Sequence, residues 1–474
     1  MDRLQGGALR SLITQPARLF MLLLIPVSAW VLIDPPALLS TQQSQVLAII
    51  ILTLGLLVTN VLPGYMTALL FFLAAVLLKV GTPAEIFSGF YSAAFWLIVA
   101  GMVIGMAIKS TGLGDRIAAI LGRHLEHSYG WLIGGLMLSC TLLGFLMPSS
   151  MGRAVMMIPI GLALADRCGF EAGSKGRTGI ALAIAFGCHM PTFAILPANI
   201  PNVVLIGAAE TIYNLHLSYT HYLLLHFPIL GALKAVLVAW LIIRLFPDTP
   251  AARNPDAGTT EAGAVAKGQG QLKLGVVLLI TLGFWITDSV HGISPAWVGL
   301  AATCFLLLPG IGLVDSKRFS AGMDMTLLIY IAGILGVGRL VASSGLGSVL
   351  ATQLEQLLPL EQGADFVNFV SLSLMSFVAA LGVTLPGVPA VLTPMATDLA
   401  AQTGWSIETV LMTQVLGFST VLFPYQSGPL LVSMQLAKEP IGHLLRVTIP
   451  LTLVTLLILM PLDYLWWNLV GELG

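Results

Sequence analysis

The residues best suited to bind a small ion stand together where an apolar stretch is interrupted. The interruption reads Pro148-Ser149-Ser150-Met151-Gly152-Arg153. Serine hydroxyls donate and accept hydrogen bonds, and a guanidinium can hold a carboxylate through two parallel hydrogen bonds. Because Pro148 cannot continue a helix and Gly152 tolerates conformations that other residues resist, the segment predicts a tip between two helices. We expect Ser149, Ser150 and Arg153 to bind substrate there.

Arg153 has two interpretations. A charged side chain at membrane depth costs about 3 kcal/mol or more unless it faces a cavity or a partner. Its guanidinium would therefore replace a bound cation, or clamp a substrate carboxylate. Alternatively, the tip opens to the cytoplasm and Arg153 extends its charged end into water.

Three further interruptions break apolar stretches in the same way, at residues 384–389, 191–202 and 423–429. Unwound backbone exposes carbonyls that can bind a cation, and the N-terminus of the following half-helix presents N–H groups to an anion. Such breaks are tolerated at membrane depth where protein or water satisfies the freed groups. For each interruption alone, an ordinary loop or a kinked span is the alternative interpretation. Together they predict four more substrate-binding residues: Asn202, Thr384, Gly387 and Ser427.

The composition indicates that lipid is the solvent for much of the surface. Of 474 residues, 57% are hydrophobic and 9% are charged, with a mean hydropathy of +0.94. Soluble domains carry about 25% charged residues. The chain has no basic tract for nucleic acid, and its four cysteines show no CxxC spacing. With no Walker A, HExxH or GxSxG sequence either, we expect neither an enzyme nor an ATP-driven pump.

Ten uninterrupted apolar stretches approach the length needed to span a bilayer, about 20 residues. They begin after an N-terminal segment that lacks a signal-peptide cleavage site, so we expect the first helix to be retained. A polar segment at residues 247–271 predicts a linker. The stretches are Leu19–Ile33, Val46–Leu62, Met66–Val80, Phe95–Ile108, Trp131–Met147, Leu272–Val290, Trp297–Leu313, Leu327–Val341, Phe366–Val383 and Thr448–Val470.

The linker separates two halves that resemble one another. The sequence from Ala100 to Gly105 resembles that from Ala332 to Gly336, and Pro159 corresponds to Pro394, at offsets of 332 − 100 = 232 and 394 − 159 = 235. Shared glycine-rich composition is the alternative explanation. Lys and Arg residues place the N-terminus and the linker in the cytoplasm, and the C-terminus outside. One leading helix and five crossings per half then give about eleven transmembrane helices in two inverted repeats.

The motif from Ser149 to Pro159 resembles the first hairpin of the divalent anion–sodium symporter family, and the Pro201-Asn202 motif resembles that family's downstream broken helix. The resemblance implies an inverted-repeat homodimer that moves dicarboxylates, citrate or sulfate by an elevator-type shift, usually with sodium. It also implies a sodium site at Ser149, Ser150 and Asn199. The second tip departs from the family pattern, because Leu385 stands where the family has asparagine. We therefore expect sodium coupling to be weakened or absent.

These observations predict an all-α polytopic protein of the cell (inner) membrane that is a secondary active transporter of small anions. An anion channel of the same fold, or a permease coupled to protons or to exchange, is the alternative. His189, beside the first broken helix, would either carry a coupling proton or pack as a buried histidine. The predicted segments are an N-terminal helix (1–40), repeat 1 (41–247) with a re-entrant hairpin (148–168) and a broken helix (179–210), a cytoplasmic linker (248–272), and repeat 2 (273–474) with a hairpin (384–402) and a broken helix (407–436).

Overall fold

The computed structural model describes residues 16–114, 116, 128–147, 149–250, 269–310 and 312–473. Pro148, the residues before 16 and most of the predicted linker lie outside this part of the chain. The described residues form helices and contain no strand. They divide into two units, which are described separately: unit 1 comprises residues 1–95, 204–216 and 324–414, and unit 2 comprises residues 96–203, 217–323 and 415–474.

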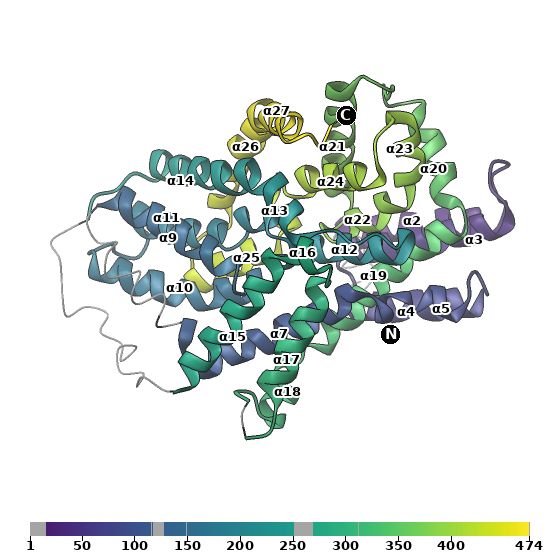
Figure 1. Ribbon diagram of the computed structural model, residues 1–474. Coiled ribbons are helices and arrows are strands. Elements are labelled where there is room, and N and C mark those ends of the chain that lie inside the picture. Colours follow the sequence, from purple (N-terminus) through teal and green to yellow (C-terminus); the bar gives the residue numbers. More distant parts are fainter. Residues whose placement is uncertain are drawn as a thin grey trace, which may run out of the picture. The chain divides into compact units, whose positions relative to one another are not determined.

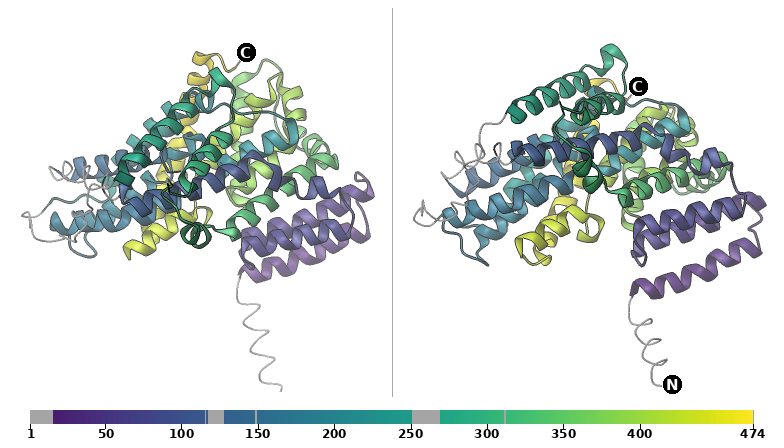
Figure 2. Two further views of the ribbon diagram at one scale, coloured as in Figure 1. Left: turned by 60° about the horizontal axis from the view of Figure 1, so that its bottom comes forward. Right: turned by 90° about the horizontal axis from the view of Figure 1, so that it is seen from below.

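Unit 1 is built around α19, which packs against helices from the N-terminal part of the chain. Figure 2 shows α2, α3 and α4 side by side. Small residues allow the backbones to approach: a Cβ on Gly89 would lie 2.2 Å from the carbonyl oxygen of Ala332. Aromatic and branched side chains, including Phe71 and Leu340, fill the core. The elements are α2 (Pro16–Ile33), α3 (Thr41–Thr59), α4 (Gly64–Leu77), α5 (Pro83–Ile86), α6 (Ser88–Tyr91), α19 (Met325–Ser343), α20 (Leu346–Glu355), α21 (Asp365–Gly382), α22 (Gly387–Leu392), η4 (Thr393–Met395) and α23 (Ala396–Thr403).

Unit 2 contains the first predicted tip, the unwound parts of both broken helices and two long spans (Figure 1). Three helices cross the boundary between the units: α7 (Ala93–Thr111), α12 (Ile200–Tyr213) and α24 (Ile407–Phe418). The remaining elements are α9 (Tyr129–Gly144), α10 (Ser150–Arg167), α11 (Lys175–Gly187), η1 (Pro191–Ala194), η2 (Leu196–Ala198), α13 (Tyr219–His226), η3 (Phe227–Leu233), α14 (Lys234–Leu245), α15 (Gln269–Ile286), α16 (Asp288–His291), α17 (Pro295–Leu307), α18 (Ser316–Gly322), η5 (Pro424–Gln426), α25 (Gly428–Ala437), α26 (Gly442–Val454), η6 (Thr455–Leu459) and α27 (Met460–Val470).

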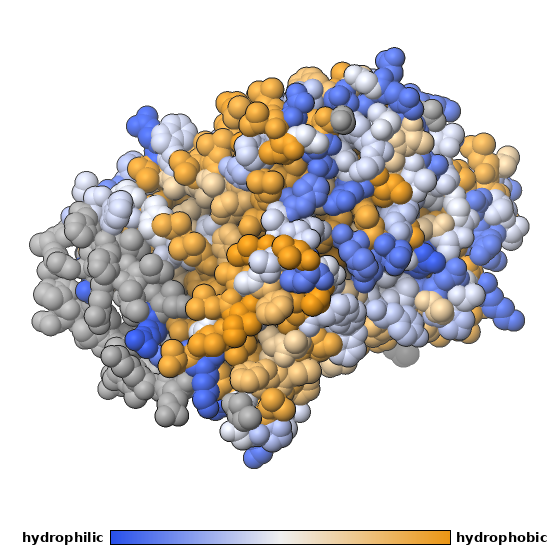
Figure 3. All heavy atoms as spheres, in the orientation of Figure 1, coloured by the Kyte–Doolittle hydropathy of each residue, from blue (hydrophilic) through white to orange (hydrophobic). Residues whose placement is uncertain are grey.

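Six helical spans in the described part of the chain are long and apolar enough to cross a membrane. Shorter apolar helices accompany them, and large apolar side chains gather on the surface over α15 and α17 (Figure 3). The total of eleven crossings and their inverted arrangement stay predictions. The span at 219–245 is absent from the ten uninterrupted stretches noted above. The six spans are Thr41–Thr59, Ala93–Thr111, Tyr219–Leu245, Met325–Ser343, Asp365–Gly382 and Gly442–Val470.

Corresponding helices of the two halves recur at a nearly constant spacing. α19 begins 325 − 93 = 232 residues after α7, and α24 begins 407 − 175 = 232 residues after α11. The spans at 219–245 and 442–470 each contain a π-helical segment, and the second begins 455 − 227 = 228 residues after the first. Each half therefore has the same order of an unbroken span, a broken helix and a π-containing span.

Candidate ion and substrate site at the helix breaks

The first tip is stabilised by its own serine. Ser149 is the N-cap of α10, and its Oγ accepts a hydrogen bond from the backbone N–H of Gly152 at 3.0 Å. Serine is favoured at this position because it satisfies a donor that the first helical turn leaves unpaired. Ser149 is exposed, whereas Ser150 is buried. The helix then continues through Pro159 to Arg167.

The first broken helix unwinds between α11 and α12, where prolines end regular hydrogen bonding. All residues from 188 to 199 are buried, so their backbone carbonyls need partners within the protein. Asn202 supplies two of these, since its amide donates to the carbonyls of Phe193 and Ile195, both at 2.9 Å. The hydroxyl of Tyr222 donates to the Phe193 carbonyl as well, at 2.8 Å. The predicted substrate residue Asn202 thus also holds the shape of the break.

Arg153 lies at the centre of this break and is completely buried. One guanidinium nitrogen, Nη2, donates to Ser150 Oγ at 3.1 Å and to Thr192 Oγ1 at 2.9 Å. The same nitrogen lies 2.8 Å from the Cys188 carbonyl oxygen and 3.3 Å from that of Ala198. Because the side chain points into the break, the interpretation that it extends into water is wrong for this structure.

The rest of the guanidinium and its neighbours complete the network. The other terminal nitrogen, Nη1, donates to the carbonyl of Met147, which immediately precedes the tip. Asn199 forms a short contact with Ser150 and donates to Thr192 Oγ1 at 2.9 Å. The Arg153 guanidinium therefore connects the first tip to the first broken helix. Two of the three predicted sodium ligands, Ser150 and Asn199, lie beside it.

The second broken helix unwinds between α24 and α25. Gln426 Oε1 accepts from the backbone N–H groups of Leu422 and Phe423, at 3.0 and 2.8 Å. Ser427 caps α25 by accepting from the N–H of Leu430 at 3.4 Å. α25 packs against α10, and a Cβ on Gly428 would lie 3.8 Å from the end of the Met151 side chain. The predicted residue Ser427 is thus on the helix that packs beside the first tip.

The remaining two predicted substrate residues, Thr384 and Gly387, belong to unit 1. Thr384 Oγ1 lies 3.4 Å from the hydroxyl of Tyr330, and its carbonyl accepts from the Gly387 N–H at 2.7 Å. Leu385, between them, is buried. This tip offers a hydroxyl and backbone groups, but no side-chain amide.

The oxygens around Arg153 do not fit a sodium ion in addition to the guanidinium. Sodium would need several oxygens in a closed shell, and the Ser150 hydroxyl, together with the carbonyls facing it, already surrounds Nη2. Two like charges about 4 Å apart would repel by about 4 kcal/mol at an effective dielectric constant near 20. The guanidinium of Arg153 therefore lies beside two of the three predicted sodium ligands, Ser150 and Asn199, and the sodium site stays a prediction.

The sequence matches the family model described as the sodium:sulfate symporter transmembrane region over residues 14–473. The chain belongs to this family. The match confirms the resemblance noted in the sequence. Because the family consists of multi-pass membrane transporters, it also confirms the prediction that the chain is not an enzyme. A membrane protein of Cupriavidus necator is 24% identical over 81% of this chain and 76% of its own length.

Two other similar proteins carry more specific names. The dicarboxylate transporter 2.2, chloroplastic, of Arabidopsis thaliana is 26% identical over 93% of this chain and 82% of its own. The L-tartrate/succinate antiporter of Escherichia coli is 25% identical over 81% of this chain and 80% of its own. The crystal structure of the Alcanivorax borkumensis YdaH transporter has a TM-score of 0.53, with 17% identity over 97% of this chain and all of that one, which supports the transporter fold.

Sequence reasoning missed most partners of Arg153 because they are backbone carbonyls, which leave no residue-type signature. It also missed Lys234, whose Nζ donates to the carbonyl of Ser419 at 2.9 Å, just beyond the end of α24. The signal was present: Lys234 is a solitary charge early in an otherwise apolar run from 229 to 243.

Proposed function

We propose that this protein is a secondary transporter of a small dicarboxylate-class anion, in which Arg153 is a fixed positive charge that replaces a bound sodium ion at the first break. The observation that carries this proposal is the set of four oxygens within 3.3 Å of one guanidinium nitrogen. The family and the names of two relatives, a dicarboxylate transporter and a tartrate/succinate antiporter, support the substrate class.

The positive charge of Arg153 is the charge that we expect to attract the substrate anion. Arg153 stays positively charged, because a guanidinium keeps its proton at physiological pH. A permanent charge attracts an anion in every step of the cycle, whereas a sodium ion can leave. This favours sodium-independent transport, including exchange of one anion for another, over sodium-driven accumulation. Ser149 and Ser427 would add hydroxyl donors on the same unit, and Asn202 would hold the shape of the break beside them.

The test is counterflow in proteoliposomes. Vesicles loaded with unlabelled succinate should take up labelled succinate several-fold faster than empty vesicles, because exchange returns the carrier loaded. A channel of the same fold would show no such stimulation. Citrate, sulfate and tartrate added outside as competitors would rank the anions, and absence of stimulation by each of these internal anions in turn would refute the proposal.

We also propose that the cycle is an elevator-type movement of a homodimer, with the N-terminus in the cytoplasm. The breaks support an anion site near the bilayer midplane, as in other repeat-built transporters. Thiol labelling of cysteines introduced at Ser149, from each side of the membrane, tests the movement. Accessibility that switches sides between the loaded and the empty protein is expected, and accessibility fixed on one side would contradict it.

A further inference from the structure

Two π-containing spans of unit 2 each carry one buried charge. Lys234 follows the π-helical segment η3 directly, and Asp463 follows η6 by four residues. The two side chains are 1% and 0% exposed. Charges within membrane spans are costly and mark ion pathways and proton relays, and π-helical segments are frequent at functional sites. The paired position of these residues in two equivalent spans therefore calls for a functional explanation.

Lys234 connects this pair to the second break. Its ammonium donates to the backbone carbonyl of Ser419 at 2.9 Å and reaches the Ser419 hydroxyl at 3.5 Å. Ser419 directly follows α24, so the ammonium compensates the negative end of that half-helix. Lys234 also lies near Asp463, because α27, which carries Asp463, packs against η3, which ends directly before Lys234. A change of charge at Asp463 therefore changes the electrostatic potential at the Lys234 ammonium, which binds the Ser419 carbonyl at the second break.

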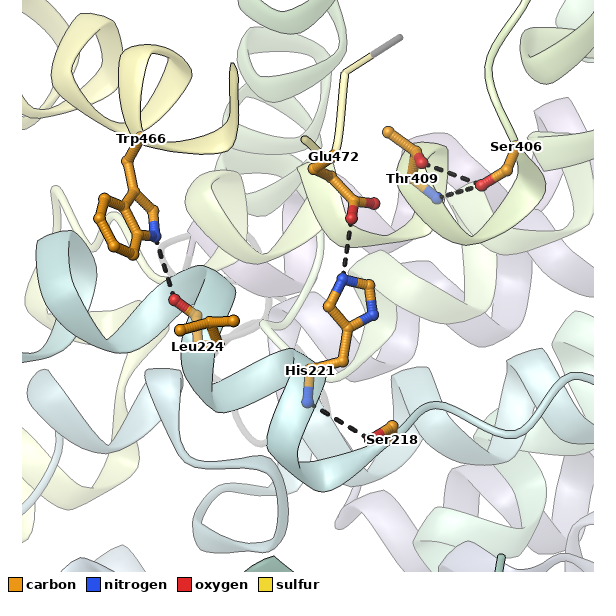
Figure 4. Close-up of polar contacts among 7 residues, drawn as sticks. All are labelled: Ser218, His221, Leu224, Ser406, Thr409, Trp466 and Glu472. Carbon is orange, nitrogen blue, oxygen red and sulfur yellow. Dashed lines mark hydrogen bonds and ion pairs between the residues drawn. The ribbon is translucent and has the colours of Figure 1, made fainter. Parts of the chain in front are cut away.

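A row of aromatic and ionisable side chains runs from α27 to α13. Trp467, one turn further along α27, packs edge-on against the ring of His226, with centroids 5.7 Å apart. His226 is fully buried, and neither of its ring nitrogens forms a hydrogen bond within the described residues. It interacts electrostatically with His221, whose Nε2 lies 2.8 Å from Glu472 Oε2 (Figure 4). The His221 side chain is 37% exposed and lies at the surface of the described residues.

The helices packed against Asp463 present few other titratable groups. η3 and α14 contribute Lys234, and α13 contributes the two histidines and two tyrosines, Tyr219 and Tyr222. The Tyr222 hydroxyl donates to the Phe193 carbonyl, and the Tyr219 ring stacks on Trp285. Asp463 is thus the buried acid among the described residues of these elements, and Lys234 is its cationic neighbour.

We infer that Asp463 is a proton-binding site that couples anion transport to protons, with Lys234 as its buried cationic neighbour and with Trp467, His226, His221 and Glu472 between it and the surface. When Asp463 is ionised, its charge offsets that of Lys234. When it takes up a proton, the positive charge of Lys234 beside the second break is no longer offset, and an anion is bound more tightly. By thermodynamic reciprocity, a bound anion favours protonation of Asp463 to the same extent.

This inference rests on the proposed anion transport, and the experiment separates the two. Proteoliposomes containing the full chain are assayed for labelled succinate counterflow without a pH gradient, and for net uptake with the outside more acidic than the inside. Working between about pH 7 and about pH 8 keeps free carboxylates ionised. Wild-type protein should show both activities, and a gradient of one pH unit supports accumulation of about tenfold for each coupled proton. Asp463→Asn should retain counterflow and lose the response to the gradient, while Asp315→Asn, which changes an exposed helix cap of the same unit, should lose neither.

Every other outcome refutes either the proposed function or the proton site. Wild-type vesicles without counterflow would refute the proposed function, and wild-type counterflow with no gradient response would overturn the proton site alone. A gradient response that survives in Asp463→Asn would overturn it as well. Should Asp463→Asn fail to yield folded protein, Asp463→Glu is read instead: it keeps a carboxyl group and is expected to shift the pH midpoint of uptake. An unshifted midpoint would overturn the inference, since a merely structural carboxylate would not set that midpoint.

Discussion

Replacing Arg153 with alanine should create a sodium-dependent protein from a sodium-independent one. The substitution removes the donor for the carbonyls of Met147, Cys188 and Ala198. Thr192 Oγ1 lies 3.3 Å from the Cys188 carbonyl and can satisfy part of that demand. Breaking a buried charge network costs about 3–5 kcal/mol, so the variant should be less stable by about that amount in sodium-free buffer.

Sodium should return part of this loss, because the oxygens left behind are those that a sodium ion needs. At a concentration one hundred times its Kd, a ligand adds about 2.7 kcal/mol to stability. Thermal unfolding of purified protein, followed by intrinsic tryptophan fluorescence, measures this directly. At about 2–4 °C per kcal/mol, as for soluble domains of 150–250 residues, the variant should gain several degrees in sodium relative to choline at equal ionic strength.

The wild-type protein is the internal control, and its unfolding temperature should be the same in both salts. For Arg153→Lys, the rise in unfolding temperature caused by sodium should lie between those of the wild type and Arg153→Ala. An ammonium keeps the charge but lacks the planar geometry of the guanidinium. Stabilisation of the wild type by sodium, with none in Arg153→Ala, would refute the assignment of Arg153 as the resident cation.

Three further substitutions and one control test the packing of the helices. Gly89→Ala should lower the free energy of unfolding by about 1–3 kcal/mol, since its Cβ would lie 2.2 Å from the Ala332 carbonyl oxygen. The control is Gly105→Ala, inside α7, where nothing lies within 4 Å of the new Cβ; it should raise the free energy of unfolding by up to about 1 kcal/mol in the same assay. Asp288→Ala removes the carboxylate that accepts from Ser218 and from backbone N–H groups at the start of α13, and should cost about 1–2 kcal/mol by thermal unfolding. Asn202→Leu leaves two buried carbonyls without their amide donor and should reduce both stability and succinate counterflow, whereas unchanged counterflow would separate Asn202 from the site.

The sequence predicted the parts of this fold that depend on residue type. Proline and glycine clusters marked both broken helices, and the structure interrupts its helices at 188–199 and 419–427. What periodicity could not reveal is that the guanidinium turns into the break, because its partners are carbonyls on residues as different as Met147 and Ala198.

The span at 219–245 shows a different limit. His221, His226, Pro228 and Lys234 interrupt its apolar run, so it does not read as an uninterrupted membrane helix. The chain nevertheless continues helically through Pro228 by widening into the π-helical segment η3. The residues that interrupt the apolar run are also those that give the span its buried lysine and its two histidines. Solitary ionisable residues in an apolar run therefore do not exclude a membrane span.

The central claim, a fixed charge in place of a coupling cation, is tested most directly by counterflow with sodium removed. Vesicles loaded with succinate take up labelled succinate in media whose sodium has been replaced by choline at equal ionic strength. The account predicts equal initial rates in the two media for the wild-type protein, and rates that require sodium for Arg153→Ala. A wild-type rate that falls to the level of empty vesicles without sodium would contradict it.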